Sequence, residues 1–193
     1  TNPFTHKMVH LSKPLSWIIT LLWMFMVTKT IDFMDGLDGL AAGIGAIAAG
    51  VLGIMAYYSK QYHVALMAAT LSGACAGFLR FNFNPAKIFM GTGGSQLIGF
   101  CLGAISVIGA FKVAAAMAIA LPVLVLGVPI IDGLYVMFHR LYTRKPIHVA
   151  DKSHLHHRLM ARGLTHKQAV FVIYGICILL GATAIWLAIT HLR

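Results

Sequence analysis

Residues 39–59 decide the fold class: they read GLAAGIGAIAAGVLGIMAYYS, with no charged side chain in 21 positions. A helix needs about 20 consecutive apolar residues to cross the hydrocarbon core of a bilayer. Strands of transmembrane barrels are shorter and alternate apolar with polar residues. The stretch therefore predicts a membrane-spanning α-helix.

Other uncharged runs predict further spans, at residues 14–28, 61–79, 88–111, 113–131 and 168–192. The first is short, but it extends to Leu11 if Lys13 snorkels to the interface. The run 113–131 continues past Asp132 through Phe138, which places that carboxylate near the membrane boundary. We expect an all-α fold, a polytopic membrane bundle of about six transmembrane helices that forms a single integral membrane domain over residues 1–193.

The composition agrees with a membrane protein. Hydrophobic residues make up 59% of the chain and charged residues 10%, against about 25% charged residues in soluble domains. This excludes a disordered or an ordinary water-soluble protein. The net charge of +10 would suggest nucleic acid in a soluble chain, but in a chain this apolar it indicates the positive-inside bias of membrane proteins. Cys75, Cys101 and Cys177 lie inside apolar runs and match no disulfide or zinc pattern.

The loops sort by the parity of the six spans. Loops 29–38, 80–92 and 139–167 fall on one side and carry ten Lys and Arg, whereas the other side carries five. The positive-inside rule assigns the first side to the cytoplasm. All five Asp also fall there. The sequence therefore predicts a multi-pass protein of the cell membrane with a polar site at the cytoplasmic ends of its helices.

The first of these loops places Asp32, Asp35 and Asp38 at a spacing of three. Clustered carboxylates repel one another unless a cation or protons compensate their charge. Mg²⁺ suits such oxygen ligands together with phosphate groups. Asp38 is also a candidate N-cap for the next helix. The alternative is that the acids only cap a helix and pair with Lys29 or Lys87.

The second loop ends in a glycine-rich turn, Gly91-Thr92-Gly93-Gly94-Ser95, at the start of the fourth span. Such a turn directs backbone N–H groups toward an anion. It lacks the Lys of a Walker A loop. Its glycines also suit close packing between membrane helices, which remains the alternative.

The third loop gathers histidines and basic residues: His148, Lys152, His154, His156, His157 and Arg158. A zinc site needs a defined set of four ligands, and no Cys is near. Phosphate or diphosphate binding fits better, with Arg158 as a bidentate donor. The alternative is a solvated loop that is basic only for topology. Together the three loops match phosphoryl chemistry at a membrane surface, with a lipid as one substrate.

Three motifs resemble those of the polyprenyl-phosphate N-acetylhexosamine-1-phosphate transferase family. They are DGLDGLAAG at Asp35–Gly43, FNFNPAKIFMG at Phe81–Gly91 and SHLHHRL at Ser153–Leu159. The last is similar to the strap of the branch that transfers N-acetylglucosamine (GlcNAc) 1-phosphate. The motifs stand in the family's order, and the resemblance covers essentially the whole chain.

The resemblance implies transfer of a sugar 1-phosphate, with GlcNAc-1-phosphate as the expected group, from a UDP-amino sugar such as UDP-GlcNAc. The acceptor would be undecaprenyl or another polyprenyl phosphate, and UMP would be released. The reaction belongs to cell-wall or surface polysaccharide synthesis. The implied cofactor is Mg²⁺, with Mn²⁺ as the alternative. The implied partners are the UDP-sugar, the polyprenyl phosphate lipid and the membrane, with no nucleic acid and with a homodimer left open.

The resemblance also assigns site residues. Asp35 and Asp38 match the catalytic aspartates, and Asp32 and Thr92 fall on the metal site. The substrate-binding positions are Asn82, Lys87, His154, His156, His157 and Arg158.

Three departures from the family matter. Asp32 stands where the family often has Asn, Thr92 stands where it usually has Asp, and the acidic DDxxD loop of the family's N-terminal half is absent. We therefore expect the C-terminal part of a longer transferase, with little activity alone. One alternative is an inactive homologue that binds nucleotide sugar or lipid phosphate. An ion-coupled transporter is disfavoured because no Asp lies in the middle of a span.

Overall fold

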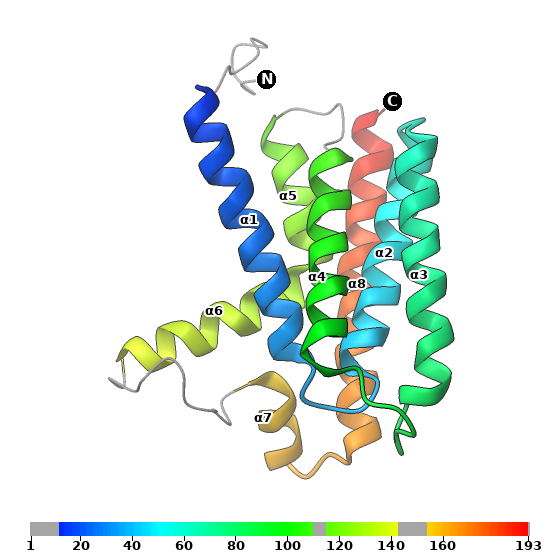
Figure 1. Ribbon diagram of the computed structural model, residues 1–193, viewed down its shortest axis with the longest axis vertical. Helices are drawn as coiled ribbons and strands as arrows, with labels where there is room; N and C mark the ends of the chain where they lie inside the picture. The colour runs from blue at the N-terminus through cyan, green and yellow to red at the C-terminus, as the bar shows by residue number, and fades with distance from the viewer. Residues whose placement is uncertain (1–11, 110–114, 143–153, 193) are drawn as a thin grey trace.

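A computed structural model describes residues 12–109, 115–142 and 154–192. Over these residues the chain forms helices and no strands, which confirms the all-α prediction (Figure 1). The helices are, in order, α1 (Lys13–Met34), α2 (Leu40–Tyr58), α3 (Tyr62–Asn82), α4 (Gly91–Ile108), α5 (Ala115–Val125), α6 (Gly127–Tyr142), α7 (Leu155–Ala161) and α8 (His166–Leu192).

Five helices are long and apolar enough to cross a membrane, namely α1, α2, α3, α4 and α8. They correspond to five of the six predicted spans. Most of their ends lie within a few residues of the sequence-based limits, although α1 continues past residue 28 to Met34. The chain is therefore a multi-pass membrane protein.

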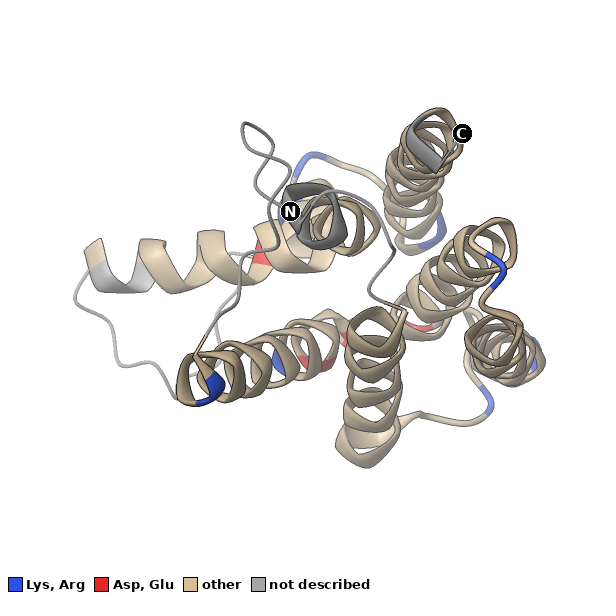
Figure 2. Ribbon diagram, turned by 90° about the horizontal axis from the view of Figure 1, so that it is seen from above, with Lys and Arg blue, Asp and Glu red and all other residues tan. Residues whose placement is uncertain are grey.

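The prediction of one continuous span over 113–131 and on to Phe138 is wrong. The chain turns at Leu126, between α5 and α6, and α6 leaves the bundle at a steep angle (Figures 1 and 2). Pro129 explains the break, because a proline has no N–H for the carbonyl of Val125 and its ring would clash there in a continuous helix. In the first turn of a new helix the same proline is tolerated.

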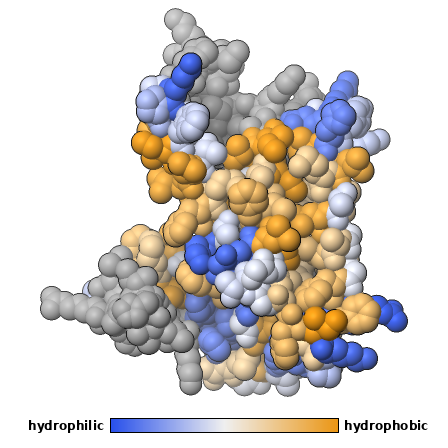
Figure 3. Space-filling view, in the orientation of Figure 1, coloured by the Kyte–Doolittle hydropathy of each residue, from blue (hydrophilic) through white to orange (hydrophobic). Residues whose placement is uncertain are grey.

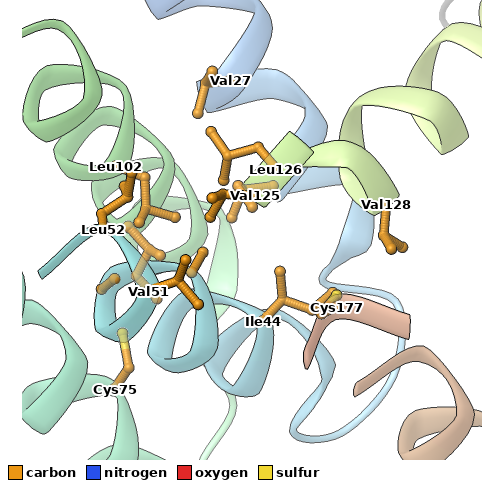
Figure 4. Packing of buried hydrophobic residues seen from close by; sticks show 14 of the residues in the cluster. Val27, Ile44, Val51, Leu52, Cys75, Leu102, Val125, Leu126, Val128 and Cys177 are labelled. Atoms are coloured by element: carbon orange, nitrogen blue, oxygen red, sulfur yellow. The ribbon is translucent and has the colours of Figure 1, made fainter. Parts of the chain in front are cut away.

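Helix α2 lies at the centre of the bundle and is the most buried of the five candidate spans. Its Ile44 and Leu52 belong to a core that includes Leu102 of α4 and Cys177 of α8 (Figure 4). In lipid, apolar side chains gain little from facing protein rather than acyl chains, so close packing matters more than apolar character. The core thereby fixes the positions of the helix ends that carry the polar residues.

Helices α1 and α4 approach closely because two glycines of α4 face α1. A β-carbon on Gly99 would lie 2.7 Å from the Cα of Thr28, and one on Gly103 would lie 3.0 Å from the Sδ of Met24. This spacing of four is the small-residue pattern of membrane helix pairs. Trp23 of α1 donates a hydrogen bond to Ser106 of α4 (2.8 Å). This contact joins the middle of α1 to the last turn of α4.

The surface has the layout of a membrane protein. Figure 3 shows an apolar band with hydrophilic residues toward both ends and a hydrophilic patch that interrupts the band below its middle. Viewed from above, most of the ribbon carries no charge (Figure 2). At the α2–α3 turn, exposed Tyr57, Tyr58 and Tyr62 form ring contacts. Such aromatic residues are typical of a membrane–water interface.

Candidate functional site at one end of the bundle

Three polar segments meet at one end of the bundle, as loop parity predicts. They are the turn at 35–39 between α1 and α2, the segment 83–90 between α3 and α4, and α7 with the residue before it (Figure 1). The part of the third loop at 143–153, with His148, Asp151 and Lys152, lies outside the described residues. The assignment of this end to the cytoplasm stays a prediction.

Asp32 lies in the last turn of α1, and its carboxylate faces the start of α4. It accepts hydrogen bonds from Oγ of Ser95 (2.7 Å) and Nε2 of Gln96 (3.1 Å). Nζ of Lys29 lies 3.2 Å from its Oδ2. The Lys29 pairing that the sequence left open is therefore present. Asp32 is already stabilised by three donors, and it joins α1 to α4.

Asp35 is the residue that ends α1, and its backbone N–H donates to the carbonyl of Asp32 (3.2 Å). Its own carboxylate has no hydrogen bond to any residue that the structure describes. Burial, and then the nearby charge of Asp32, raises the pKa of Asp35 from 3.8 to about 6. The negative charge of this carboxylate is therefore unfavourable where it lies, and a bound cation or a proton would compensate it.

Asp38 faces a different partner, the segment between α3 and α4. Its Oδ2 accepts hydrogen bonds from Nδ2 of Asn84 (3.0 Å) and from the backbone N–H of Ala86 (3.1 Å). The expectation that Asp38 caps α2 is wrong, because Gly39 is the N-cap residue, with a φ of 82° that suits glycine. Asp38 instead joins the two motif loops.

Asn82 has a similar joining position. Its side chain is buried; Oδ1 accepts the N–H of Gly39 (3.0 Å) and Nδ2 donates to the carbonyl of Ile88 (2.9 Å). Together these loops enclose a cavity of about 260 Å³. The cavity is lined by Asp35, Gly36, Leu37, Asp38, Asn82, Phe89, Met90 and Gly91. The predicted catalytic aspartates thus share one concave site.

Helix α7 presents the histidine-rich motif to this site. His156 is 1% exposed, and neither ring nitrogen has a hydrogen-bond partner in the part of the chain that the structure describes. A β-carbon on Gly36 would lie 2.5 Å from its Nε2, so the imidazole lies directly against the turn that holds Asp35. Burial, then the neighbouring His157 and His154, lowers the pKa of His156 to about 4. His156 is therefore a neutral ring beside the carboxylate site.

Asp132 of α6 was given no role by the sequence analysis. It is buried, its Oδ2 lies 2.8 Å from Nδ1 of His154, and its Oδ1 accepts the backbone N–H of Leu155 (2.7 Å). The signal in the sequence was its place as a single acid directly after the uncharged run 113–131. The two ends of this contact lie 22 residues apart, and no short motif spans them.

The predicted cationic residues lie nearer the surface. Arg158 and Lys87 are exposed and His157 is half-buried. The guanidinium of Arg158 stands over the ring of Tyr135, 4.7 Å from its centroid, a cation–π contact. Arg158 and Tyr135 also line a second cavity of about 220 Å³ between α6, α7 and α8, which is mostly apolar.

The described residues contain no cluster of three or more His, Cys, Asp or Glu side chains arranged to hold a metal ion. Thr92 is exposed in the first turn of α4, and its carbonyl accepts a hydrogen bond from Ser95, whose hydroxyl also contacts Asp32. Mg²⁺ commonly takes only one or two carboxylates and completes its shell with water and phosphate oxygens. Asp35 lines the cavity between the motif loops, whereas Asp32 and Thr92 are not among its lining residues.

Residues 1–110 match glycosyl transferase family 4. A Bacillus subtilis (strain 168) protein named probable undecaprenyl-phosphate N-acetylglucosaminyl 1-phosphate transferase is 38% identical over 185 residues, which cover 91% of this chain and 52% of the relative. A decaprenyl-phosphate N-acetylglucosaminephosphotransferase of Mycolicibacterium smegmatis is 39% identical over 82% of this chain and 44% of the relative.

A phospho-N-acetylmuramoyl-pentapeptide-transferase of Halalkalibacterium halodurans is more distant, at 31% identity over 89% of this chain and 51% of the relative. The chain therefore spans about half the length of the curated relatives it matches. The family match covers more than half of the chain and includes the Asp35 and Asn82 motifs. The chain belongs to glycosyl transferase family 4.

Proposed function

We propose that this chain carries the catalytic end of an enzyme that transfers GlcNAc-1-phosphate from UDP-GlcNAc to a polyprenyl phosphate. The observation that carries the proposal is the contact of His156 with Gly36. It joins a carboxylate site to a segment rich in His and Arg, at the end of a bundle of membrane helices. The names of the two nearer relatives support GlcNAc and a polyprenyl lipid.

In the proposed reaction an oxygen of the lipid phosphate attacks the phosphorus that bears the sugar. The bond from that phosphorus to the oxygen bridging to the uridine phosphate breaks, and UMP leaves with the bonding electron pair. The product is a polyprenyl diphosphate sugar. Such transfers depend mainly on positioning and on compensation of the phosphate charges.

The residues divide this work by their chemistry. Asp35 has a pKa of about 6, so near neutral pH it can accept the proton of a phosphate monoester. Arg158 and Lys87 are exposed cations that would bind the phosphate oxygens. Asp38 and Asn82 hold the loops around the cavity. His156 lies against Gly36 at the carboxylate turn, and the rings of His154 and His157 contact it.

A divalent cation, Mg²⁺ with Mn²⁺ as the alternative, would be held by Asp35 and Asp32 with the Thr92 hydroxyl nearby, and would compensate the charge of the diphosphate. Asp35 is the best supported of these ligands because its carboxylate has no protein donor in the described chain. Asp32 would have to share its oxygens with Ser95, Gln96 and Lys29.

The site is proposed to face the cytoplasm, where UDP-sugars are made. Single cysteines at His157 and at Lys60 test this, because the two positions lie at opposite ends of the bundle. An impermeant thiol reagent applied to intact cells should label position 60 and spare position 157. The reverse pattern would overturn the orientation.

The activity is tested by UMP release from UDP-GlcNAc with polyprenyl phosphate in detergent. The assay uses this chain alone and joined to the N-terminal half of the Bacillus subtilis relative. We expect Mg²⁺-dependent release from the joined protein, and a loss of about 100-fold or more in Asp35→Asn, in the range of lost acid–base catalysis. His63→Gln is the control, an exposed residue at the far end of the bundle. Full activity of Asp35→Asn would overturn the proposed role.

A further inference from the structure

Asp132 is a buried acid that lies outside the three motif loops. It lies on α6, the helix that leaves the bundle, and is 5% exposed. An isolated buried carboxylate is costly unless hydrogen bonds satisfy it. Its partners therefore show what the residue does.

Both oxygens of Asp132 are used, and both bind the start of α7. Oδ1 accepts the backbone N–H of Leu155 at 2.7 Å, and Oδ2 lies 2.8 Å from Nδ1 of His154. Leu155 is the first residue of α7 and His154 its N-cap. The N-cap side chain makes no capping bond of its own. Asp132 thus supplies from α6 the acceptor that a helix N-terminus requires.

The same contact orients the imidazole of His154. An ionised carboxylate can only accept hydrogen bonds, so the proton of this bond lies on Nδ1 of His154. In the neutral ring Nε2 is then left as an acceptor. The ring of His154 stacks on that of His156, with centroids 5.7 Å apart and planes 7° from parallel.

His156 in turn lies against Gly36, beside Asp35. A chain of contacts therefore runs from Asp132 through His154 to His156 and the carboxylate turn.

We infer that Asp132 is a positioning residue that holds the start of α7, so that His156 stays against Gly36 at the carboxylate site. Its relevance to turnover rests on the proposed function, but its effect on the position of α7 does not. Without the carboxylate, α7 loses two hydrogen bonds at its N-terminus and the histidines separate from the turn.

The test measures the position of His156 without any assay of activity. Diethyl pyrocarbonate acylates accessible imidazoles, and mass spectrometry of peptides gives a rate for each histidine. In the unaltered chain His156 should react slowly, because it is 1% exposed, and His63 should react rapidly. In Asp132→Leu, which has no acceptor, the rate at His156 should rise about 10-fold or more, the effect of losing hydrogen bonds to a charged group.

Matched variants separate positioning from general damage. Asp132→Asn keeps an oxygen that accepts from Leu155, so it should restore part of the protection. Ile131→Leu changes the exposed neighbour on α6 and should change nothing. The thiols of Cys75 and Cys177 are buried and report global unfolding by their reaction with a maleimide.

If Asp132→Leu unfolds, Leu155→Pro tests the same contact from the side of α7. Proline suits the first position of a helix and removes the N–H that Asp132 accepts. It also shortens the packed Leu155 side chain, so Leu155→Ala, which keeps the N–H, is its control. Protection of His156 should then fall in Leu155→Pro while Cys75 stays unreactive. Slow labelling of His156 in Leu155→Pro, or in a folded Asp132→Leu, would overturn the inference. A failed UMP assay would contradict the proposed function and leave this result intact.

Discussion

The imidazole of His156 lies directly against Gly36, and no side chain larger than hydrogen fits between them. A β-carbon on Gly36 would come within 2.5 Å of Nε2 and 2.8 Å of Cε1 of His156. These two atoms belong to a ring that is itself buried, so the ring has little room to move away. The glycine therefore allows the histidine-rich helix to contact the carboxylate turn.

Gly36→Ala is expected to displace α7 from the turn. The added methyl group should cost about 1–3 kcal/mol of stability, the usual penalty for overpacking, and should lower UMP release by about 10-fold or more through misplaced groups. Thermal unfolding in detergent and the UMP assay measure the two effects.

Gly77→Ala is the control, since a β-carbon there meets nothing within 4 Å. That change should be neutral or slightly stabilising in its helix. The double variant Gly36→Ala with His156→Ala should lose less than the sum of the single changes, because the clash needs both side chains. Additive losses would contradict the contact.

Asp35→Asn is expected to stabilise the metal-free protein near neutral pH. The folded state raises the pKa of Asp35 from 3.8 to about 6, so it binds the proton more tightly than the unfolded state does. Stability from Asp35 is thus present at low pH and falls as the pH rises through about 6. The variant should have the higher Tm at about pH 7.5, with the difference vanishing toward about pH 4.

Mg²⁺ gives a second measurement on the same pair of proteins. The ion should raise the Tm of the unaltered chain at about pH 7.5, because binding to the folded state stabilises it. It should have a smaller effect on Asp35→Asn. An equal Mg²⁺ response in both proteins would exclude Asp35 as a ligand.

His156 has the opposite pH dependence. Its pKa falls from 6.5 to about 4 on folding, so its contribution to stability is complete above 6.5 and is lost as the pH falls toward 4. This window overlaps that of Asp35, and the two effects offset each other in the unaltered chain. His156→Gln should therefore become more stable on acidification, whereas Asp35→Asn should become less stable.

The measurement is Tm against pH for both variants, with His63→Gln as the exposed control. That control should follow the unaltered chain. Parallel curves for His156→Gln and Asp35→Asn would show that neither group titrates as the packing implies.

The sequence predicted most spans well because a helix that crosses the hydrocarbon core needs a long run of apolar residues. Gly39–Ser59 became α2 with its ends shifted by one residue. The failure at 113–131 has a local cause. The length of an apolar run limits how long a helix can be, but Pro129 decides where this helix ends. A search for uncharged runs does not separate proline from the apolar residues around it, so it missed the break.

The sequence placed Asp35, Asp38 and Asn82 in one site, and they line one cavity. It did not predict their hydrogen-bond partners. Asp32 and Asp35 were expected to share one cation, yet Asp32 faces α4. Asp38, the other predicted catalytic acid, faces Asn84. The directions of these carboxylates depend on where α1 ends, and a spacing of three residues in the sequence does not determine that end. The partnership of Asp132 with His154 joins two loops whose distance is set only by the tertiary fold.

Ser95→Ala is expected to loosen the contact between α1 and α4. Ser95 is fully buried and donates to Asp32 at 2.7 Å. Loss of a buried hydrogen bond to a charged group costs about 1–3 kcal/mol, and unfolding by detergent or heat should show it. Thr70→Ala is the control, because its exposed hydroxyl bonds only to its own helix. Equal stabilities of the two variants would contradict a joining role for Asp32.

Thr92→Asp is expected to raise the affinity of the chain for Mg²⁺. The hydroxyl of Ser95 contacts both the Thr92 carbonyl and Asp32, so position 92 lies at the same end of α4 as the carboxylate site. A carboxylate in the first turn of a helix is favoured by the helix dipole. The charge of Asp32 is already balanced by Lys29 and by two further donors, which reduces the repulsion that a new acid would meet.

The Mg²⁺ dependence of Tm measures that affinity, and Thr92→Asn, which has the same shape without the charge, is the control. The carboxylate should shift the midpoint of the Mg²⁺ titration to lower concentration by about 10-fold, equivalent to about 1.4 kcal/mol, whereas the amide should not. The shift should be smaller in the double variant that combines Thr92→Asp with Ser95→Ala, because Ser95 holds Asp32 beside the start of α4. A midpoint that moves to higher Mg²⁺ would mean that the crowded carboxylates of Asp32, Asp35 and position 92 repel one another more than the ion attracts them.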